Sequence, residues 1–296
     1  MTKCLQCLHQ VFGKISCAAK GARRQNSRLL ASTQFLCFGE YILYKSQETY
    51  NINSCDPIEV FYNIRIDYDK INYAAHITKI IQDVTNENEN SYKILQLYLN
   101  TLYMISETDK DMDFILSIFK IKLLCILGFK PRIEKCVNCG GKDDLLYFSI
   151  KDNGVKCKNC KTQDKGAISI TPSTYMALKY IIEAPSKKLF NFKLKDDSLK
   201  ELKLLSNIYF NQKLEKEYKF SKNPWHKVYF VIYYCSMKFS DEVECGYTLW
   251  KHKDGGNFDG VCHGLDQAVS SKNTYPKVFM RFGILYWWKT KHQGAL

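Results

Sequence analysis

The sequence lacks any apolar run long enough to cross a membrane. A membrane-spanning helix needs about 20 consecutive apolar residues, and the longest stretch here, near Leu123 to Phe129, is far shorter. The first residues also lack the apolar segment and small-residue cleavage site of a signal peptide. We therefore expect a cytoplasmic protein without a membrane partner. In a reducing cytosol its 13 cysteines are expected to be metal ligands or small buried apolar residues.

Short motifs of common enzyme classes are also absent from the sequence. It contains no His-Glu-x-x-His, no phosphate-binding Gly-x-x-x-x-Gly-Lys and no Gly-x-Ser-x-Gly. The acidic pairs Asp143-Asp144, Asp196-Asp197 and Asp241-Glu242 resemble the carboxylates of a metal-dependent nuclease. They fit a ribbon turn, a helix N-terminus and a tail segment better. We therefore expect a protein that is not an enzyme.

Acidic residues are too few to balance the positive charge. The chain has 43 Lys and Arg against 30 Asp and Glu, a formal net charge of +13 over 296 residues. This excess favours nucleic acid or an acidic membrane surface as a partner, although charge alone also fits a basic protein with neither. The length indicates about two domains, and a hydrophobic fraction of 46% suffices for a sizeable core.

The first sixty residues are expected to form short strands. Residues 11–19 and 35–44 combine apolar, aromatic and β-branched residues that favour strands. Between them, residues 20–28 form a basic loop with a turn-type glycine, Gly21. Several short strands joined by turns indicate a small barrel or meander.

Helical periodicity begins near residue 68 and continues, with one interruption, to about residue 209. Apolar residues recur at helical spacing in five segments, which begin near residues 68, 91, 111, 171 and 196. Asn90-Ser91 offers an N-cap to the second segment, and Pro172 suits the first turn of the fourth. The interruption, from about residue 131 to 169, contains two Cys-x-x-Cys pairs.

The segment after about residue 220 has no sustained helical or strand period. It holds all four tryptophans and four of the six histidines. No motif connects these residues, so we assign no site to Trp225, His252, Cys262 or His263.

Four cysteines form the most specific motif of the sequence. Cys136-Val-Asn-Cys139 and Cys157-Lys-Asn-Cys160 are separated by 17 residues, the arrangement of a zinc ribbon. Four thiolates complete a tetrahedron with no open position, which indicates a structural zinc ion and not a catalytic one. The alternative is four reduced cysteines packed as small apolar residues. Cys4 and Cys7 have no second pair nearby, and we expect no metal there.

Basic residues near the amino end are candidates for DNA binding. Lys20, Arg23, Arg24 and Arg28 lie in one expected loop, and Lys14 and Lys45 join them if the flanking strands are adjacent. A cationic groove on a small barrel is how many OB-type modules follow a single strand. The alternative is a solvated loop, and the same two interpretations apply to the ribbon lysines Lys151, Lys156, Lys158, Lys161 and Lys165.

Aromatic residues in the same strands are candidates for base stacking. A place in the barrel core is the alternative for each of them. The residues are Phe12, Phe35, Phe38, Tyr41 and Tyr44.

Several of these segments resemble one known family, the RecO recombination mediators. Residues 12–24, Phe-Gly-Lys-Ile-Ser-Cys-Ala-Ala-Lys-Gly-Ala-Arg-Arg, and residues 27–31 resemble its signature strand and basic loop. Residues 38–45, 56–61 and 73–75 continue the likeness. The segment Leu123-Leu-Cys-Ile-Leu-Gly-Phe-Lys-Pro131 resembles the family's entry to its zinc ribbon.

The resemblance implies an α+β fold with an N-terminal OB-type β-barrel and an α-helical domain that carries an inserted zinc ribbon. We expect the barrel at residues 1–64, the helical domain at 65–217 with the ribbon at 133–168, and an atypical tail at 218–296. Family members begin with a further strand, which residues 1–11 do not resemble. The barrel is therefore expected to lack its first strand.

The resemblance also implies a non-catalytic role in DNA repair and homologous recombination. Members of the family bind single- and double-stranded DNA and anneal complementary strands coated by single-strand DNA-binding protein (SSB). With RecR they help to load the recombinase. The implied partners are therefore DNA, RecR and the C-terminal tail of SSB, at the nucleoid of the cytoplasm. Carried over by position, the DNA-binding residues are those of the basic loop, and the zinc ligands are the four cysteines.

A zinc-ribbon scaffold that binds only proteins is the alternative function. The helices at 68–129 are expected to expose enough apolar surface to hold an acidic, apolar peptide. The salt dependence of DNA binding separates the two functions. For a phosphate-binding protein, the logarithm of the affinity for single-stranded DNA falls with the logarithm of the salt concentration, with a slope of about −0.7 per phosphate contact. A scaffold that binds only proteins shows no DNA binding to titrate.

Overall fold

The chain divides into two compact units. The computed structural model describes residues 2–46 and 49–220, and the backbone of three short strands beyond them. The barrel unit comprises Met1–Val60, Gln82–Leu95 and Lys227–Leu296, and the helical unit comprises Phe61–Ile81 and Gln96–His226. The residues of the tail to which we assigned no site, Trp225, His252, Cys262 and His263, lie outside the described residues, as does the pair Asp241-Glu242.

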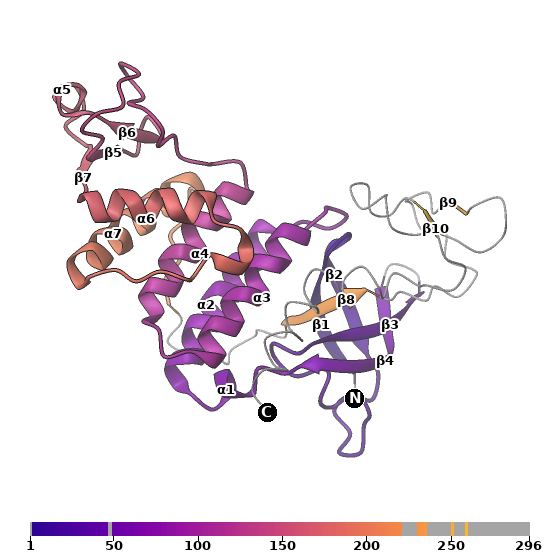
Figure 1. Ribbon diagram of the computed structural model, residues 1–296. Coiled ribbons are helices and arrows are strands. Elements are labelled where there is room, and N and C mark those ends of the chain that lie inside the picture. Colours follow the sequence, from indigo (N-terminus) through magenta and orange to yellow (C-terminus); the bar gives the residue numbers. More distant parts are fainter. Residues whose placement is uncertain (1, 47–48, 221–229, 236–249, 252–257, 260–296) are drawn as a thin grey trace. The chain divides into compact units, whose positions relative to one another are not determined.

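The barrel unit contains a closed five-stranded barrel, which confirms the expected α+β class (Figure 1). The order around the barrel is β1-β2-β4-β3-β8. β1 pairs with β2, and β3 with β4, in antiparallel hairpins, whereas the pairings of β2 with β4 and of β8 with β1 and β3 are parallel. The strands are β1 (Lys3–His9), β2 (Gly13–Ala19), β3 (Phe38–Ser46), β4 (Thr49–Glu59) and β8 (Phe230–Cys235).

Strand β1 corrects the expectation that no barrel strand precedes Gly13. It pairs with β2 in continuous register, from Lys3↔Ala19 to His9↔Gly13. Leu5 and Cys7 are buried while Cys4 and Gln6 are exposed, so the first part of the strand has the period of two of a half-buried strand. At its end Cys7, Leu8 and His9 are all buried. A cysteine acts as a small apolar residue here, which the motif-based interpretation of Cys4 and Cys7 overlooked.

Strand β8 corrects the expectation that no strand follows residue 220. It closes the barrel by lying between β1 and β3. Its sequence, Phe-Val-Ile-Tyr-Tyr-Cys, consists of β-branched, aromatic and cysteine residues, and the first two kinds favour strands. Two further short strands, β9 (Trp250–Lys251) and β10 (Phe258–Asp259), form a separate two-stranded sheet.

The loop between the second and third helices is joined to the β1–β2 turn by backbone hydrogen bonds. The N–H of Lys14 donates to the carbonyl of Asn86 at 3.0 Å, and the N–H of Asn88 donates to the carbonyl of Phe12 at 2.8 Å. Gly13 has a positive φ of 65°, and a Cβ atom there would lie 2.0 Å from the Asn86 carbonyl oxygen. Only glycine therefore fits this contact.

Helices form most of the helical unit, and their beginnings match the expected ones. The Asp111 carboxylate accepts from the N–H of Phe114 at 2.8 Å, and Pro172 occupies the first turn of α6. Within this unit α4 packs against α6 and α7. The helices are α1 (Tyr62–Arg65), α2 (Tyr68–Val84), α3 (Tyr92–Glu107), α4 (Met112–Ile126), α6 (Pro172–Glu183) and α7 (Asp196–Lys213), with a 3-10 turn at Ser186–Lys188. The end of α2 and the start of α3 belong to the barrel unit, which includes Gln82–Leu95.

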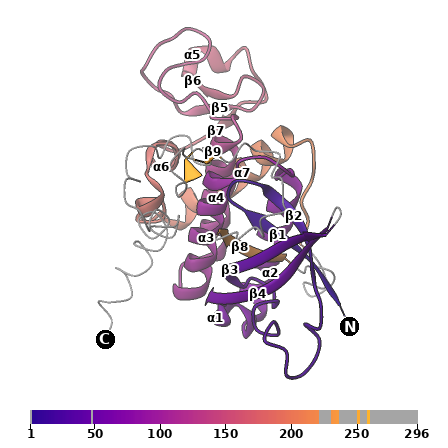
Figure 2. The ribbon, with the colours of Figure 1, turned by 90° about the vertical axis from the view of Figure 1, so that its right-hand side faces the viewer.

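A small three-stranded sheet interrupts the helices at the expected place. Its order is β6-β5-β7, with antiparallel pairings of β5 to both neighbours. Figures 1 and 2 show this sheet and the short helix α5 at one end of the helical unit. The elements are β5 (Tyr147–Ser149), β6 (Gly154–Lys156), α5 (Lys158–Lys161) and β7 (Ile168–Ser169).

Few large apolar side chains are exposed on the helices at 68–129, where we expected an apolar surface. Between residues 68 and 129 the large apolar side chains that are exposed are Tyr68 and Phe129, at the two ends, because the helix faces pack on one another. Other exposed large apolar residues of the helical unit include Met176, Leu204 and Ile208. Within the described part of the chain, no helix has the length and apolar character needed to span a bilayer.

Candidate metal centre and nucleic-acid interface

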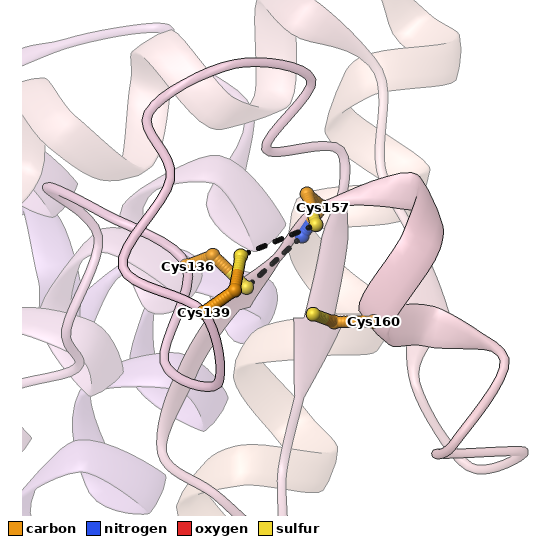
Figure 3. Close-up of side chains that lie close together, drawn as sticks. All are labelled: Cys136, Cys139, Cys157 and Cys160. Atoms are coloured by element: carbon orange, nitrogen blue, oxygen red, sulfur yellow. Dashed lines mark hydrogen bonds between the residues drawn. The ribbon is translucent and has the colours of Figure 1, made fainter.

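The four cysteines of the expected zinc ribbon meet at the ends of two tight backbone turns. In the first turn the N–H of Gly140 donates to the carbonyl of Cys136 at 2.9 Å, and Gly140 has a positive φ of 75°. In the second turn the N–H of Lys161 donates to the carbonyl of Cys157 at 3.0 Å, and Cys157 is the N-cap of the short helix α5. Each turn directs its two sulfurs toward the other pair (Figure 3).

The sulfur positions fit a tetrahedral ion. All four Sγ atoms lie within 4.8 Å of one another, and those of Cys139 and Cys157 are 3.7 Å apart. Zinc–sulfur bonds of about 2.3 Å in a tetrahedron place the sulfurs about 3.8 Å apart. The cluster could therefore hold a metal ion with shifts of its sulfurs of about 1 Å or less, and in it Cys136 is buried and Cys139 is exposed.

The pKa values of two thiols of the cluster show how a bound cation would stabilise it. Burial opposes ionisation of Cys136, but backbone N–H groups of Cys139, Cys157 and Asn138 outweigh it and lower the pKa of this thiol to about 6. Burial and the neighbouring sulfurs raise the pKa of Cys160 to about 12. The first thiolate is thus favoured and the last is disfavoured, because like charges at this distance repel. A bound dication removes that penalty.

A buried ion-pair network lies directly before the second cysteine pair. The ammonium of Lys156 contacts the carboxylates of Asp152 at 2.5 Å and Asp164 at 3.0 Å. Ser149 donates to Asp164 at 2.6 Å, and the Lys156 side chain is only 3% exposed. Because Lys156 precedes Cys157, these contacts fix the chain at the metal turn. Lys156, expected among the ribbon lysines available to phosphates, is instead engaged here.

The basic loop at residues 20–37 is ordered by short-range hydrogen bonds and by two buried anchors. The N–H of Arg24 donates to the carbonyl of Gly21, and the N–H of Ser27 to the carbonyl of Arg24, both at 3.0 Å. Ala22 and Leu29 are buried in the barrel core. The loop is therefore a fixed part of the barrel surface, which the sequence did not predict.

Four cations project from this loop into solvent. Lys20, Arg23, Arg24 and Arg28 are all exposed, and within the described residues none of them takes part in an ion pair. The surrounding sequence reinforces their charge, since residues 1–39 contain six Lys and Arg and no Asp or Glu. An array of fixed, unneutralised cations is the surface that binds phosphates.

The two remaining basic candidates have partners of their own. Lys14 donates from Nζ to the carbonyl of Gln82 at 2.9 Å, near the end of α2, where a cation offsets unpaired carbonyls. Lys45 lies 5.9 Å above the ring of Tyr50, in the β3–β4 hairpin. The structure thus brings Lys20, Arg23, Arg24 and Arg28 together and places Lys14 in the contact between turn and helix.

Most of the candidate stacking residues belong to the barrel core. Phe12, Phe38 and Tyr41 are buried, Phe35 is partly exposed and Tyr44 is 38% exposed. Tyr41 has another role that its sequence did not reveal, because its hydroxyl donates to the carbonyl of Ser32 in the basic loop at 2.5 Å. Lys3 donates from Nζ to the adjacent carbonyl of the loop, that of Thr33, also at 2.5 Å.

Comparison with protein families matches nearly all of the described chain. The model for "Recombination protein O N terminal" matches residues 3–61, and that for "Recombination protein O C terminal" matches residues 65–222. The boundary between the two falls at the end of β4. The first match includes the basic loop and the second includes all four cysteines of the cluster.

Several curated relatives are similar to this chain over most of their length. A protein named DNA repair protein RecO in Acetivibrio thermocellus is 44% identical over 207 residues, which are 70% of this chain and 82% of the relative. One of the same name in Alkaliphilus metalliredigens is 33% identical over 205 residues, covering 69% and 78%. The Bacillus subtilis protein is 28% identical over 255 residues, covering 86% and 92%. A match of that extent includes β8, so the similarity to the Bacillus subtilis protein extends past the helical unit.

Proposed function

The chain belongs to the RecO family of DNA repair proteins, and we propose that it binds DNA strands through their phosphates and brings them together. The DNA is single- or double-stranded and is bound without regard to its base sequence, because phosphate contacts carry no base information. Base pairing between complementary strands then supplies the free energy of annealing. The role is not catalytic, and DNA as the ligand implies a place at the nucleoid.

One observation carries this proposal, the exposed cations of the basic loop. Lys20, Arg23, Arg24 and Arg28 are held on a loop whose Ala22 is buried in the barrel core. A loop fixed before binding loses little conformational entropy when phosphates dock on it. The absence of acidic residues from positions 1–39 keeps the local potential positive. Together these features favour a nucleic-acid surface over a solvated loop.

Zinc is the proposed ion of the cysteine cluster. Cys136, Cys139, Cys157 and Cys160 would hold it, and a closed set of four thiolates supplies folding energy and no open position for a substrate. The four cysteines would hold the ion between the two turns of the ribbon, where its charge would offset half of the charge of the four thiolates. The ion-pair network of Lys156 supports the same turn from the protein side.

RecR and the C-terminal tail of SSB are proposed as partners on the basis of family membership. An acidic, apolar peptide requires exposed apolar side chains on a positively charged protein. Met176, Leu204 and Ile208 of α6 and α7 are exposed, and the chain carries a net charge of +13. We therefore propose the α6–α7 region, and not the helices at 68–129, for the SSB tail.

Charge removal from the basic loop tests the DNA-binding proposal. The variant changes Arg23, Arg24 and Arg28 to Ala, and the control changes three exposed lysines of the helical unit, Lys187, Lys188 and Lys193, to Ala. Both variants lose the same charge. If three phosphate contacts are lost, the log–log salt slope for single-stranded DNA falls by about 2 in the arginine variant and not in the control.

Annealing of complementary oligonucleotides is the second measurement. The arginine variant is expected to anneal slowly while it keeps its zinc content and its thermal unfolding temperature. Undiminished annealing by this variant would overturn the assignment to the basic loop. If the unaltered chain binds no DNA even at low salt, the scaffold that binds only proteins becomes the better description.

A further inference from the structure

The strand that closes the barrel, β8, follows the helical unit in the sequence. Four strands of the barrel lie within residues 3–59, whereas β8 lies at Phe230–Cys235, beyond α7. The four amino-terminal strands are ordered β1-β2-β4-β3, so without β8 their two outer strands, β1 and β3, would both be unpaired edges. Unpaired edges attract further strands. The barrel therefore contains a slot that exactly one strand fills.

The pairing of β8 in this slot is short and parallel. It extends from Gln6↔Phe230 to Leu8↔Ile232 on β1, and from Phe38↔Ile232 to Tyr41↔Cys235 on β3. The β1–β2 ladder runs over seven register pairs and that of β3–β4 over nine, against three and four for β8. Parallel pairing is also slightly less stable per residue than antiparallel pairing. The parallel β2–β4 pairing is shorter still, with two register pairs, but β2 and β4 each also belong to a long antiparallel hairpin. Of the five barrel strands, β8 alone is held only by short parallel pairings, so we expect it to open most easily.

The β3 side of the slot adjoins the basic loop. β8 pairs with the first four residues of β3, which directly follow the loop. The last of these four is Tyr41, whose hydroxyl donates to the carbonyl of Ser32 inside the loop. On the other side of the slot, β1 carries Lys3, which donates to the carbonyl of Thr33. Both edges that β8 joins are therefore also the strands to which the loop is tied.

We propose that β1 and β3 form an acceptor slot for an uncharged strand in parallel orientation, that residues 230–235 are its occupant, and that this occupancy holds the basic loop in its DNA-binding arrangement. The last part rests on the proposed function, whereas the first two do not. Strand addition between two edges uses main-chain hydrogen bonds, and the apolar sequence of β8 suits it. The carboxyl-terminal part of the chain thereby controls DNA affinity without contacting DNA.

Hydrogen exchange on the unaltered chain tests the occupancy directly. Amides of residues 230–235, of residues 6–8 and of residues 38–41 are expected to exchange together, with one shared protection factor. The shared factor should be lower than that of the β1–β2 and β3–β4 hairpins, because opening β8 leaves both hairpins intact. Exchange of residues 230–235 at the rate of an unfolded peptide would overturn the proposal without any variant.

Proline at the centre of β8 tests the consequence. Ile232 is the residue that pairs with both neighbours, with Leu8 on β1 and Phe38 on β3. Ile232→Pro removes a ladder donor from a strand with partners on both sides, where proline is not accommodated. The control is Met112→Pro, which places proline at the first helical position of α4, where no intrahelical donor is lost.

The expected result has two parts. In Ile232→Pro the protection of residues 6–8 and 38–41 is lost, while that of α4 and α7 remains, and affinity for single-stranded oligothymidylate falls about tenfold. In Met112→Pro neither changes. Unchanged protection of residues 6–8 and 38–41 in Ile232→Pro would show that β8 does not fill the slot.

Rescue in trans separates a slot from general damage. A synthetic peptide of residues 227–238, which has a lysine at each end, is added to the Ile232→Pro protein under reducing conditions. The peptide should restore protection of residues 6–8 and 38–41 and with it DNA affinity, whereas a peptide that carries the same proline should not. Failure of the unaltered peptide to restore protection would contradict an acceptor slot.

The outcomes also separate this inference from the proposed function. If β8 fills the slot but the unaltered chain has no affinity for DNA, the proposed function fails and the acceptor slot stands. If the arginine variant of the basic loop loses DNA binding while Ile232→Pro retains it with an open slot, the proposed function stands and control by β8 is refuted.

Discussion

The hydroxyl of Tyr41 donates a hydrogen bond of 2.5 Å to the backbone carbonyl of Ser32. Ser32 lies in the basic loop, and Tyr41 lies in β3, the strand that follows the loop. Tyr41 is fully buried, and burial, together with nearby Cys37, Cys55 and Cys7, holds the pKa of its phenol well above the usual range. The phenol therefore remains a donor at any physiological pH, and the loop is tied to the barrel by a neutral contact.

Tyr41→Phe should loosen the basic loop without altering its charge. Loss of the hydrogen bond leaves the Ser32 carbonyl buried without this donor, which costs about 1–2 kcal/mol of the free energy of unfolding. Affinity for single-stranded DNA should fall by a few-fold, because ordering the loop then opposes binding. The measurement is fluorescence anisotropy at fixed salt beside urea unfolding. Tyr44→Phe, at an exposed tyrosine of the same strand, is the control and should change neither.

Gly13→Ala should destabilise the barrel unit. The methyl group would lie 2.0 Å from the Asn86 carbonyl oxygen, and alanine is strained at a φ of 65°. We expect a loss of about 2–4 kcal/mol, since the turn and the loop at residues 86–91 must separate. Gly166→Ala is the control, because the nearest atom, Asp164 Oδ1, is 3.5 Å away and φ is not positive. Equal urea midpoints for the two variants would contradict this contact.

The sequence predicted what depends on local spacing. The spacing of Cys136, Cys139, Cys157 and Cys160 identified the cysteine cluster, and the place of Pro172 in the first turn of α6 followed from capping preferences. Each Cys-x-x-Cys pair and the proline of the first helical turn lie within a few residues of the turn or helix that they form.

What depends on distant partners could not be predicted. The role of Lys14 is set by Gln82, which lies 68 residues away, and that of Lys156 by two carboxylates whose positions depend on the ribbon sheet. Strand β1 was missed because its alternation uses Cys7 and His9 as buried residues. Strand β8 was missed because its partners lie 194 residues away on β3 and 224 residues away on β1, where no periodicity can indicate them.

Acid should destabilise the helical unit through His76. The His76 ring stacks on Phe220 at 4.2 Å, and burial, reinforced by Lys120, lowers its pKa to about 4 from an ordinary value of 6.5. The unfolded chain therefore binds a proton between these values while the folded chain does not, so stability falls as the pH decreases through this window. From about pH 7.5 to about pH 5 this residue alone should cost about 2 kcal/mol.

The pH effect of His76 is measured against His76→Phe, which keeps an aromatic ring beside Phe220. The unfolding free energy of the variant should fall by about 2 kcal/mol less than that of the unaltered chain over the same pH range. His9, whose pKa burial lowers to about 3, is common to both proteins and cancels in the difference. Parallel pH profiles for the two proteins would show that His76 ionises as it does in an unfolded chain.

Zinc removal tests whether the ribbon only stabilises the structure or also binds DNA. With a chelator, or in Cys139→Ser, the ribbon loses the ion that joins its two turns, and the amides of β5, β6 and β7 should lose protection from hydrogen exchange. The barrel strands and the basic loop share no ligand with the cluster, so affinity for single-stranded DNA and its salt slope should remain within about twofold. Cys4→Ser, at an exposed cysteine outside the cluster, should retain both zinc and ribbon protection. A salt slope that falls together with zinc content would instead mean that Lys151, Lys158, Lys161 and Lys165 contact phosphates, because only the ribbon has then changed.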